Sequence, residues 1–317
     1  MQKFSRVLVT GGAGFIGSHL VHRLLARGYS VVVLDNFRSG RIENISEYLK
    51  DENFKLVKGD VCDRKVVRNA MEEADAVVHL AALIDVEGSV NNPMETHRVN
   101  VDGTLNVLNE AVRSGVKKLL FASSAAVYGE DNPLPLKEDY PLKPMSPYAA
   151  SKAAAEHYCN VFHQCYRLPT VILRYFNVYG FRREYDSYSG VITAFVNNAL
   201  EDKPLVIFGD GKQTRDFIYV EDVVKATILA LKNDQSNGEI LNVCNGKPTS
   251  VQELTVILSD IIGKDSHVIY DKPRKGDVYS NYGDPTKAEK VLEFKTEISL
   301  KEGLKEIIGL RARTQKN

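Results

Sequence analysis

The chain has 317 residues, of which 44% are apolar and 26% charged, a composition typical of a globular protein with one large domain or two that share a sheet. Its 41 basic and 41 acidic residues balance, which argues against broad binding to nucleic acid or to a membrane surface, and no apolar run is long enough to span a bilayer. The 4 cysteines and 7 histidines lack metal-ligand or redox spacing, so we expect no metal and interpret the cysteines as reduced thiols of a cytoplasmic protein.

The N-terminal residues predict a dinucleotide-binding unit. Residues 6–10 form a β-branched run typical of a buried parallel strand, a glycine-rich turn follows, and residues 18–26 predict a helix. We expect no signal peptide before this strand. In the turn, Gly11 allows a tight bend, Gly14 lets the backbone approach a pyrophosphate, and Gly17 lets helix and strand pack closely. The pyrophosphate would rest on the helix N-terminus.

The next two predicted strands end in acids. Residues 29–34 form the second strand, and Asp35 follows where a carboxylate bonds the ribose hydroxyls of NAD and repels the 2′-phosphate of NADP. Arg38 and Arg41 lie close by and favour NADP, but the carboxylate at the strand end outweighs them and indicates NAD. After a third strand at 55–58, Asp60 is either a contact of the adenine amino group or the cap of a helix over 63–72.

The alternation of strands and helices continues to residue 173. Strands are predicted at 75–80, 117–122 and 170–173, and a long helix is predicted at 94–113. Ala81 and Ala82 are small enough to lie against a flat cofactor. The strand at 117–122 leads into Ser123 and Ser124, hydroxyls at the strand end where ligands bind in open α/β sheets.

Tyr148 and Lys152 form the central pair of the sequence. A loop at 133–147 precedes them, Ser146 and Pro147 are typical of a helix start, and a helix over 148–165 places the two side chains one turn apart on one face. An adjacent ammonium lowers the pKa of a phenol, which makes Tyr148 a candidate general base. The alternative is an ordinary surface pair, which is common by chance, so the surrounding motifs decide.

The second half of the chain predicts a return to the first domain and a second lobe. Helices are expected at 191–200, 221–231, 250–262, 285–292 and 300–309, strands at 205–208, 215–220, 239–243 and 268–270, and a disordered tail at 311–317. The predicted fold is α/β, a doubly wound parallel sheet of the Rossmann type with a smaller C-terminal α/β substrate lobe. Residues 1–175 and 218–243 form the NAD-binding domain, and residues 176–217 and 244–317 form the nucleotide-sugar-binding lobe.

These motifs occur together in one order. They are the glycine turn, Asp35, Ser123 and Ser124, Tyr148 with Lys152, Tyr175-Phe176-Asn177, and Arg215-Asp216. From residue 7 to about residue 292 the chain therefore resembles the extended short-chain dehydrogenase/reductase family, and within it the UDP-glucose 4-epimerase type. The segments at 209–217 and 274–277 are similar to those of members that act on nucleotide sugars.

The resemblance implies a role for each matching residue. Ser124 would bond the reacting sugar oxygen, Tyr148 would be the catalytic base, and Lys152 would bond the nicotinamide ribose and hold Tyr148 ionised. The implied NAD contacts are Gly11, Gly14, Phe15, Ile16, Gly17, Asp35, Asn36, Ser39, Gly40, Asp60, Val61, Leu80, Ala81, Ala82, Asn100, Ser123, Tyr148, Lys152 and Tyr175. The implied substrate contacts are Val86, Ser124, Tyr148, Asn177, Val191, Val206, Phe208, Arg215, Arg274, Asp277 and Asn281, with the two arginines on the diphosphate unless they form surface ion pairs.

The implied reaction is NAD-dependent inversion at C4 of a UDP-hexose through a transient 4-keto sugar. Dehydratases and decarboxylases of this family usually carry an acid after the Ser/Thr, where this chain has Ala125 and Ala126, and Ile84 replaces a lysine that some epimerases place near the cofactor phosphates. The alternatives are a UDP-glucuronate 4-epimerase, another nucleotide-sugar oxidoreductase or decarboxylase, and a non-catalytic NAD-sensing regulator. Such regulators tend to lose the tyrosine or the lysine, and both are present.

Two further expectations concern assembly and substrate breadth. Val99, Leu105, Tyr158 and Phe162 make the helices at 94–113 and 149–166 apolar over a wide arc, which predicts a homodimer through these helices, as in relatives, or deep burial within one subunit. The resemblance places Asn281 beside the sugar, where its intermediate size would admit an N-acetyl group. Alternatively, Asn281 is a turn residue away from the sugar.

Overall fold

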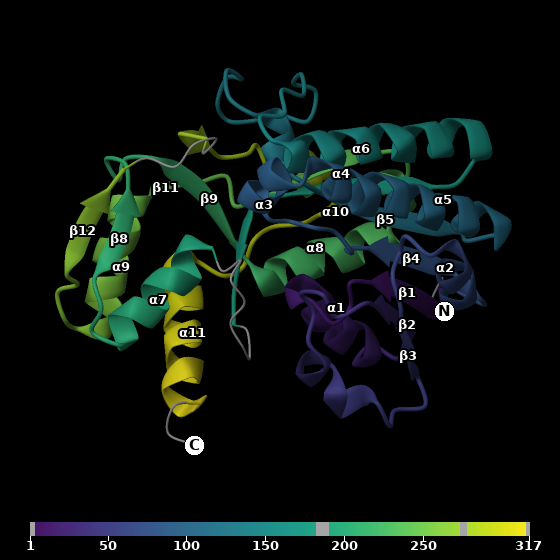
Figure 1. The fold of residues 1–317 in the computed structure, drawn as a ribbon, viewed down its shortest axis with the longest axis horizontal. Helices are drawn as coiled ribbons and strands as arrows, with labels where there is room; N and C mark the ends of the chain where they lie inside the picture. The colour runs from purple at the N-terminus through teal and green to yellow at the C-terminus, as the bar shows by residue number, and fades with distance from the viewer. Residues whose placement is uncertain (1–3, 182–189, 273–277, 315–317) are drawn as a thin grey trace.

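A computed structural model describes residues 4–181, 190–272 and 278–314, which form a large and a small lobe (Figure 1). The large lobe is built on a seven-stranded sheet with strand order β10-β6-β5-β4-β1-β2-β3, in which every pair is parallel. Its strands are β1 (Arg6–Thr10), β2 (Ser30–Asp35), β3 (Phe54–Lys58), β4 (Ala76–His79), β5 (Lys118–Ser124), β6 (Thr170–Tyr175) and β10 (Ile240–Val243). The predicted doubly wound parallel sheet is therefore confirmed.

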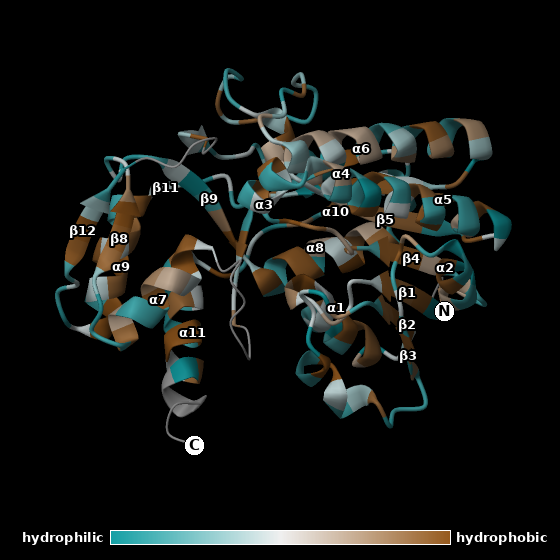
Figure 2. Ribbon diagram, viewed as in Figure 1, coloured by the Kyte–Doolittle hydropathy of each residue, from teal (hydrophilic) through white to brown (hydrophobic). Residues whose placement is uncertain are grey.

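Helices cover both faces of this sheet, because successive strand side chains point to opposite faces and are apolar on each. In β1, Val7 and Val9 belong to one buried cluster and Leu8 to another. The first cluster packs against α1 (Phe15–Leu25), α8 (Val220–Lys232) and α10 (Thr286–Leu292), and the second against α2 (Arg64–Met71), α5 (Gly103–Arg113) and α6 (Pro147–Tyr166). Figure 2 shows the hydrophobic residues gathered along the strands of the central sheet.

Helix α6 begins as its sequence predicts. The Ser146 Oγ accepts a hydrogen bond from the Ala149 N–H at 3.1 Å, and Pro147 occupies the first turn. The helix ends at Tyr166, before Arg167 in the left-handed conformation (φ 55°). This start fixes the orientation of the first turn, which carries Tyr148.

The single helix expected at 94–113 is interrupted. The structure has α4 (Pro93–His97), a π-helical turn η3 (Arg98–Asp102) and then α5, and it adds an unexpected α3 (Val86–Asn91). The π turn accommodates Asn100, whose amide donates to the Ser151 Oγ and whose Oδ1 accepts from the Leu83 N–H. Tertiary hydrogen bonds that no local pattern reveals accompany the break.

The small lobe has its own core. β7 (Asn177–Tyr179), β9 (Thr214–Tyr219), β11 (Pro248–Ser250) and β13 (Ser280–Asn281) form one sheet, and β8 (Leu205–Phe208) pairs in parallel with β12 (Val268–Asp271). The covering helices are α7 (Val191–Leu200), α9 (Val251–Ile262) and α11 (Leu300–Thr314). The remaining short helices are η1 (Ile42–Asn44), η2 (Ser46–Tyr48), η4 (Ala125–Tyr128) and η5 (Asp234–Ser236).

The path of the chain departs from our expectation at two places. α8 and β10 return to the large lobe, but so does α10, because Ala288, Leu292 and Phe294 belong to the core of the large sheet rather than to the substrate lobe. The tail expected to be disordered from residue 311 continues α11 to Thr314. Within the described ranges, no helix is both long and apolar enough to cross a membrane.

Candidate active site

A cavity of about 400 Å³ lies at the carboxyl ends of the parallel strands and reaches α7 of the small lobe. The predicted site residues that line it are Gly11, Gly14, Phe15, Ile16, Gly17, Asp35, Asn36, Ser39, Asp60, Val61, Leu80, Ala81, Ala82, Ser123, Ser124, Tyr148, Lys152, Tyr175, Asn177 and Val191. Gly40, Val86, Asn100, Val206, Phe208, Arg215 and Asn281 are not among its lining residues. Arg274 and Asp277 lie outside the described residues.

The glycine turn forms a cradle that larger residues would fill. Gly11 has φ +70°, and a Cβ there would lie 2.8 Å from the Ala81 nitrogen, while a Cβ at Gly17 would lie 2.1 Å from the Gly11 carbonyl oxygen. Gly14 starts α1 without a side-chain cap, so amide groups of the first turn are available to an anion. The turn therefore fits the diphosphate of a dinucleotide.

Asp35 is held rigidly at the end of β2. Its carboxylate accepts hydrogen bonds from the Ala13 N–H at 2.9 Å and the Phe37 N–H at 2.8 Å. Burial raises the pKa of Asp35, and these two hydrogen bonds oppose the rise. A Cβ at Gly40 would lie 2.9 Å from both carboxylate oxygens, so a larger residue at position 40 would displace the Asp35 carboxylate.

The helix-cap interpretation of Asp60 is wrong. The cap of α2 is Asp63, which accepts from the Lys65 and Val66 N–H groups. Asp60 instead accepts from the Cys62 N–H at 2.8 Å and from the Asn36 amide at 2.9 Å, and it faces the cavity. Although burial opposes it, these hydrogen bonds keep the pKa of Asp60 below its usual value, so the carboxylate is available to an amino group.

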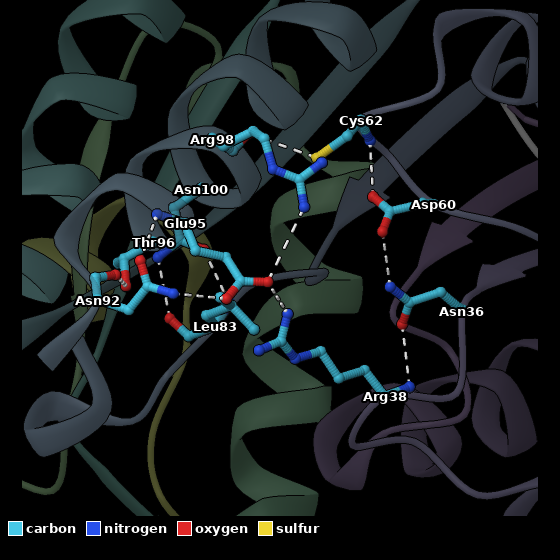
Figure 3. A network of polar contacts seen from close by, with 10 residues as sticks. All are labelled: Asn36, Arg38, Asp60, Cys62, Leu83, Asn92, Glu95, Thr96, Arg98 and Asn100. Atoms are coloured by element: carbon cyan, nitrogen blue, oxygen red, sulfur yellow. Dashed lines mark hydrogen bonds and ion pairs between the residues drawn. The ribbon is translucent and has the colours of Figure 1, made fainter.

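The charge of Arg38 is compensated within the protein. Figure 3 shows the Glu95 carboxylate in contact with the guanidinium groups of Arg38 and Arg98, while the Asn36 Oδ1 accepts from the Arg38 N–H at 3.0 Å. The Arg38–Glu95 ion pair connects the loop after β2 with α4. A compensated arginine attracts a 2′-phosphate weakly, which agrees with the preference for NAD indicated by Asp35.

The side chains of Ser124, Tyr148 and Lys152 meet in the cavity. The Tyr148 side chain lies close enough to Ser124 for the serine to lower its pKa, and the Lys152 Nζ donates to the Ala122 carbonyl oxygen at 2.8 Å. Tyr148 and Lys152 are only 8% and 4% exposed, so the alternative of a surface pair is wrong. The Lys152 ammonium also lies 4.9 Å from the centre of the Phe121 ring, a favourable cation–π contact.

The expected effect of Lys152 on Tyr148 is not found in this structure. Burial raises the pKa of Tyr148, and Ser124 is the influence that lowers it. Burial also lowers the pKa of Lys152 to about 8. The position of the Lys152 ammonium explains why it does not lower the pKa of Tyr148, because it donates to the Ala122 carbonyl oxygen at the end of β5.

Sequence reasoning missed three buried residues around this group. The Tyr148 N–H donates to the Ser89 Oγ at 3.1 Å, and the Ser123 Oγ donates to the Glu156 Oε1, which is also paired with Arg174. The hydroxyl of Ser123, an implied NAD contact, is thus engaged by Glu156. One signal was present, since Glu156 follows Lys152 by one turn on the same helix face.

A parallel sheet with a glycine cradle, an acid after β2 and a Ser–Tyr–Lys group in one cavity defines a dinucleotide-dependent enzyme of the short-chain dehydrogenase/reductase type. Residues 7–244 match the NAD dependent epimerase/dehydratase family, so the chain belongs to that family, and NAD is its cofactor.

The relatives share nearly the whole chain. A Methanocaldococcus jannaschii protein, provisionally assigned as a UDP-glucose 4-epimerase, is 44% identical over 96% of this chain and 97% of its own length. A UDP-N-acetyl-alpha-D-glucosaminuronate decarboxylase of Bacillus cytotoxicus is 36% identical over 96% of each chain. The crystal structure of a Thermotoga maritima UDP-glucose 4-epimerase with UDP-glucose superposes with a TM-score of 0.93, at 37% identity, over 98% of this chain and 99% of the other.

Proposed function

We propose that this protein inverts C4 of a UDP-hexose, interconverting UDP-glucose and UDP-galactose, and that it also accepts N-acetyl forms. The observation that carries the proposal is the set of acids around the cavity. In the described part of the chain, the only acids that line it are Asp35 and Asp60, which follow β2 and β3, and Ala125 and Ala126 follow Ser124. Tyr148 is then the proton-transfer group beside the sugar, which suits an alcohol–ketone exchange better than an elimination.

The chain's own residues have separate tasks in this reaction. Tyr148 accepts the proton of the sugar 4-hydroxyl and later returns it, and Ser124 hydrogen-bonds the same oxygen. Lys152 binds the nicotinamide ribose from the position beside Ala122 where its ammonium is held. When bound, NAD would accept the hydride from C4 of the sugar and later return it, and its nicotinamide ring would carry a positive charge. The 4-keto sugar must rotate and present its other face before it is reduced. The protein therefore has to hold the nucleotide firmly and the sugar loosely.

The main rival is a UDP-glucuronate enzyme, either a 4-epimerase or a decarboxylase. A uronate carboxylate favours a cationic partner in the site. Among the described residues that line the cavity, the cations are Arg38, which is paired with Glu95, and Lys152, which is assigned to the cofactor. This distribution favours a neutral hexose.

The test is incubation with UDP-glucose, UDP-N-acetylglucosamine and UDP-glucuronate, each followed by NMR. We expect UDP-galactose from UDP-glucose, with unchanged mass and no net formation of NADH. A product that has lost carbon dioxide or water would instead assign a decarboxylase or dehydratase. The absence of turnover on all three sugars would favour the non-catalytic alternative.

Asn281 is our proposed determinant of N-acetyl acceptance. It lies in β13 opposite Arg215, is 7% exposed, and its Oδ1 has no hydrogen-bond partner in the described structure. An unsatisfied buried amide is a place where a polar ligand group can be recognised. Although Asn281 does not line the cavity itself, Asn281→Tyr should lower kcat/KM for UDP-N-acetylglucosamine by about tenfold or more and leave UDP-glucose nearly unchanged, because a tyrosine ring is too large for this buried position and would extend into the space proposed for the acetamide. Asn281→Ser is the small-residue control. Equal effects of Asn281→Tyr on both sugars would show that Asn281 does not determine sugar specificity.

We also propose a homodimer through α3, α4 and α6. Val99 and Phe162, which we expected at the interface, are buried in the core of one subunit, so there the alternative of deep burial holds. The exposed apolar side chains on these helices are Val86, Val90, Met94, Tyr158, Val161 and Tyr166. Helix α6 lies along the outer edge of the large lobe (Figure 1), where a second copy has access to it.

A charge in this surface should separate the subunits. Val161→Asp should convert a dimer into a monomer at micromolar concentration in multi-angle light scattering, because an unpaired carboxylate is costly in an apolar interface. Val256→Asp, at an exposed position on α9, is the control and should leave the mass unchanged. A wild-type protein that is monomeric would end the dimer proposal.

We infer a cytoplasmic location from the cysteines. All four are free, including the buried Cys159 and Cys244. Free thiols of this kind are typical of proteins in a reducing compartment.

A further inference from the structure

A buried ion pair lies behind the catalytic group, between α6 and β6. The Arg174 Nε and Nη2 donate to the two Glu156 carboxylate oxygens at 2.9 and 2.7 Å, and the side chains are 2% and 1% exposed. Burial opposes the charge of Arg174, but the hydrogen bonds with Glu156 raise its pKa above the usual value, so the guanidinium stays charged. Buried pairs are costly to desolvate and add little net stability, so this one calls for another explanation.

Glu156 of this pair connects the helix that carries Lys152 with the strand that carries Ser123 and Ser124. Glu156 lies one turn after Lys152 on α6, and the two side chains hold successive residues of β5. The Lys152 Nζ donates to the Ala122 carbonyl oxygen at 2.8 Å, and the Ser123 Oγ donates to the Glu156 Oε1 at 2.5 Å. The next residue is Ser124, which lowers the pKa of Tyr148.

Arg174 is itself fixed from several directions. It pairs with Ser123 in the register of β5 and β6, its Nη1 donates to the Glu138 carbonyl oxygen at 3.1 Å, and its guanidinium lies 4.6 Å from the centre of the Tyr128 ring. Because these contacts come from β5, from η4 and from the loop between η4 and α6, Arg174 is fixed and the Glu156 carboxylate that it holds has little freedom to move.

We propose that Glu156, clamped by Arg174, is a positioning residue for the epimerase reaction. Its carboxylate stabilises the Lys152 ammonium, and its hydrogen bond with Ser123 fixes the end of β5 that presents Ser124 to Tyr148. This proposal rests on the proposed function for its kinetic consequences, whereas the charge state of Lys152 can be measured without any sugar.

The groups around Lys152 single out Glu156 as the charge that matters. Burial lowers the pKa of Lys152 to about 8, and Cys159 and Glu156 oppose that shift. Burial also raises the pKa of Cys159, which is therefore a neutral thiol, and lowers the pKa of His79 of β4 to about 3, so this imidazole is neutral too. Arg174 of β6 is paired with Glu156, so neutralising Glu156 alone also leaves the Arg174 guanidinium without its carboxylate partner.

The sign of the expected effect follows from these charges. Glu156→Gln lowers the pKa of Lys152, so the ammonium is lost at a lower pH. The alkaline limb of the kcat–pH profile should move down by about one pH unit, and KM for the nucleotide sugar should change less than about twofold. The direct measurement is NMR titration of lysine labelled at Cε and Nζ in the NAD-loaded protein, with Lys152→Met identifying the resonance.

Two variants complete the experiment. Glu110→Gln is the matched control, since Glu110 is also a buried carboxylate paired with arginines, at 2.6 Å from Arg64 and 3.0 Å from Arg68, but these partners lie on α2, away from Ser123 and Lys152. It should lose stability and keep the wild-type pH profile. Glu156→Gln/Arg174→Gln removes both charges and should shift the Lys152 titration less than the single change. It also serves if the single variant fails to fold.

The outcomes separate the two proposals. A lowered Lys152 titration together with a shifted kcat profile supports the positioning role. An unchanged Lys152 titration and profile in folded Glu156→Gln, or the same shift in Glu110→Gln, would overturn it and leave the pair a purely structural element. A lowered titration without turnover on any sugar would refute the proposed function while supporting the electrostatic role of Glu156.

Discussion

Tyr148→Phe should lower kcat by about a hundredfold or more, the loss typical when a positioned general base is removed. The change deletes only the phenolic oxygen of a side chain that lines the same cavity as Ser124 and Lys152. In the described part of that cavity the lining acids are Asp35 and Asp60, which follow β2 and β3, and β4 and β1 separate those strands from β5. The measurement is steady-state turnover of UDP-glucose, monitored as UDP-galactose by NMR.

Binding separates the loss of a base from a general defect. The affinity for UDP-glucose, measured by calorimetry, should change less than about threefold, since the nucleotide supplies most of the contacts in the proposed mode. Tyr219→Phe is the control, because Tyr219 is a buried tyrosine of the small-lobe core and does not line the cavity. Near-normal turnover of Tyr148→Phe would show that another group takes the proton.

The parts of the fold that depend on local spacing were predictable from sequence. The strand–glycine–helix opening, the cap at Ser146 and the return of residues 220–243 to the large sheet follow from periodicity and from residues with one conformational preference. Val7, Leu8 and Val9 alternate between two clusters, so even the two-sided burial of β1 was readable from the sequence.

What the sequence did not reveal depends on partners distant in the chain. The π turn at Asn100 accompanies hydrogen bonds with Leu83 and Ser151, and α10 packs on the large sheet although its own sequence has no feature that chooses a lobe. A propensity pattern contains no information on such pairings. Periodicity alone could not have separated the buried Phe162 from the exposed Tyr158 either, since both lie on one apolar arc of α6.

The pKa values of Tyr148 and Lys152 also could not be predicted from the sequence. Spacing places Tyr148 and Lys152 on one face, and the structure agrees. The pKa of Tyr148, however, depends on its burial and on Ser124, and the Lys152 ammonium is held by the Ala122 carbonyl oxygen. The sequence thus identifies which residues meet, whereas the environment that adjusts them comes from β5 and β6.

Gly17→Ala should nearly abolish NAD binding and lower the free energy of unfolding by about 2–3 kcal/mol. The added Cβ would lie 2.1 Å from the Gly11 carbonyl oxygen and 2.8 Å from the Gly12 Cα, which are backbone atoms that no rotamer change can move away. α1 must therefore shift from β1, and the amide groups of its first turn move with it. Calorimetric titration with NAD and urea unfolding measure the two effects.

Gly309→Ala provides the opposite expectation within the same chain. Gly309 also lies in a helix, α11, but a Cβ there would meet no atom within 4 Å. Alanine loses less backbone entropy than glycine in a helix, so this variant should gain about 0.5–1 kcal/mol of stability and bind NAD normally. If Gly17→Ala behaved like Gly309→Ala, close packing of α1 against the glycine turn would not be what holds the diphosphate site in place. A selective loss at Gly17 would show that this packing sets the cofactor site, because helix propensity is the same at both positions.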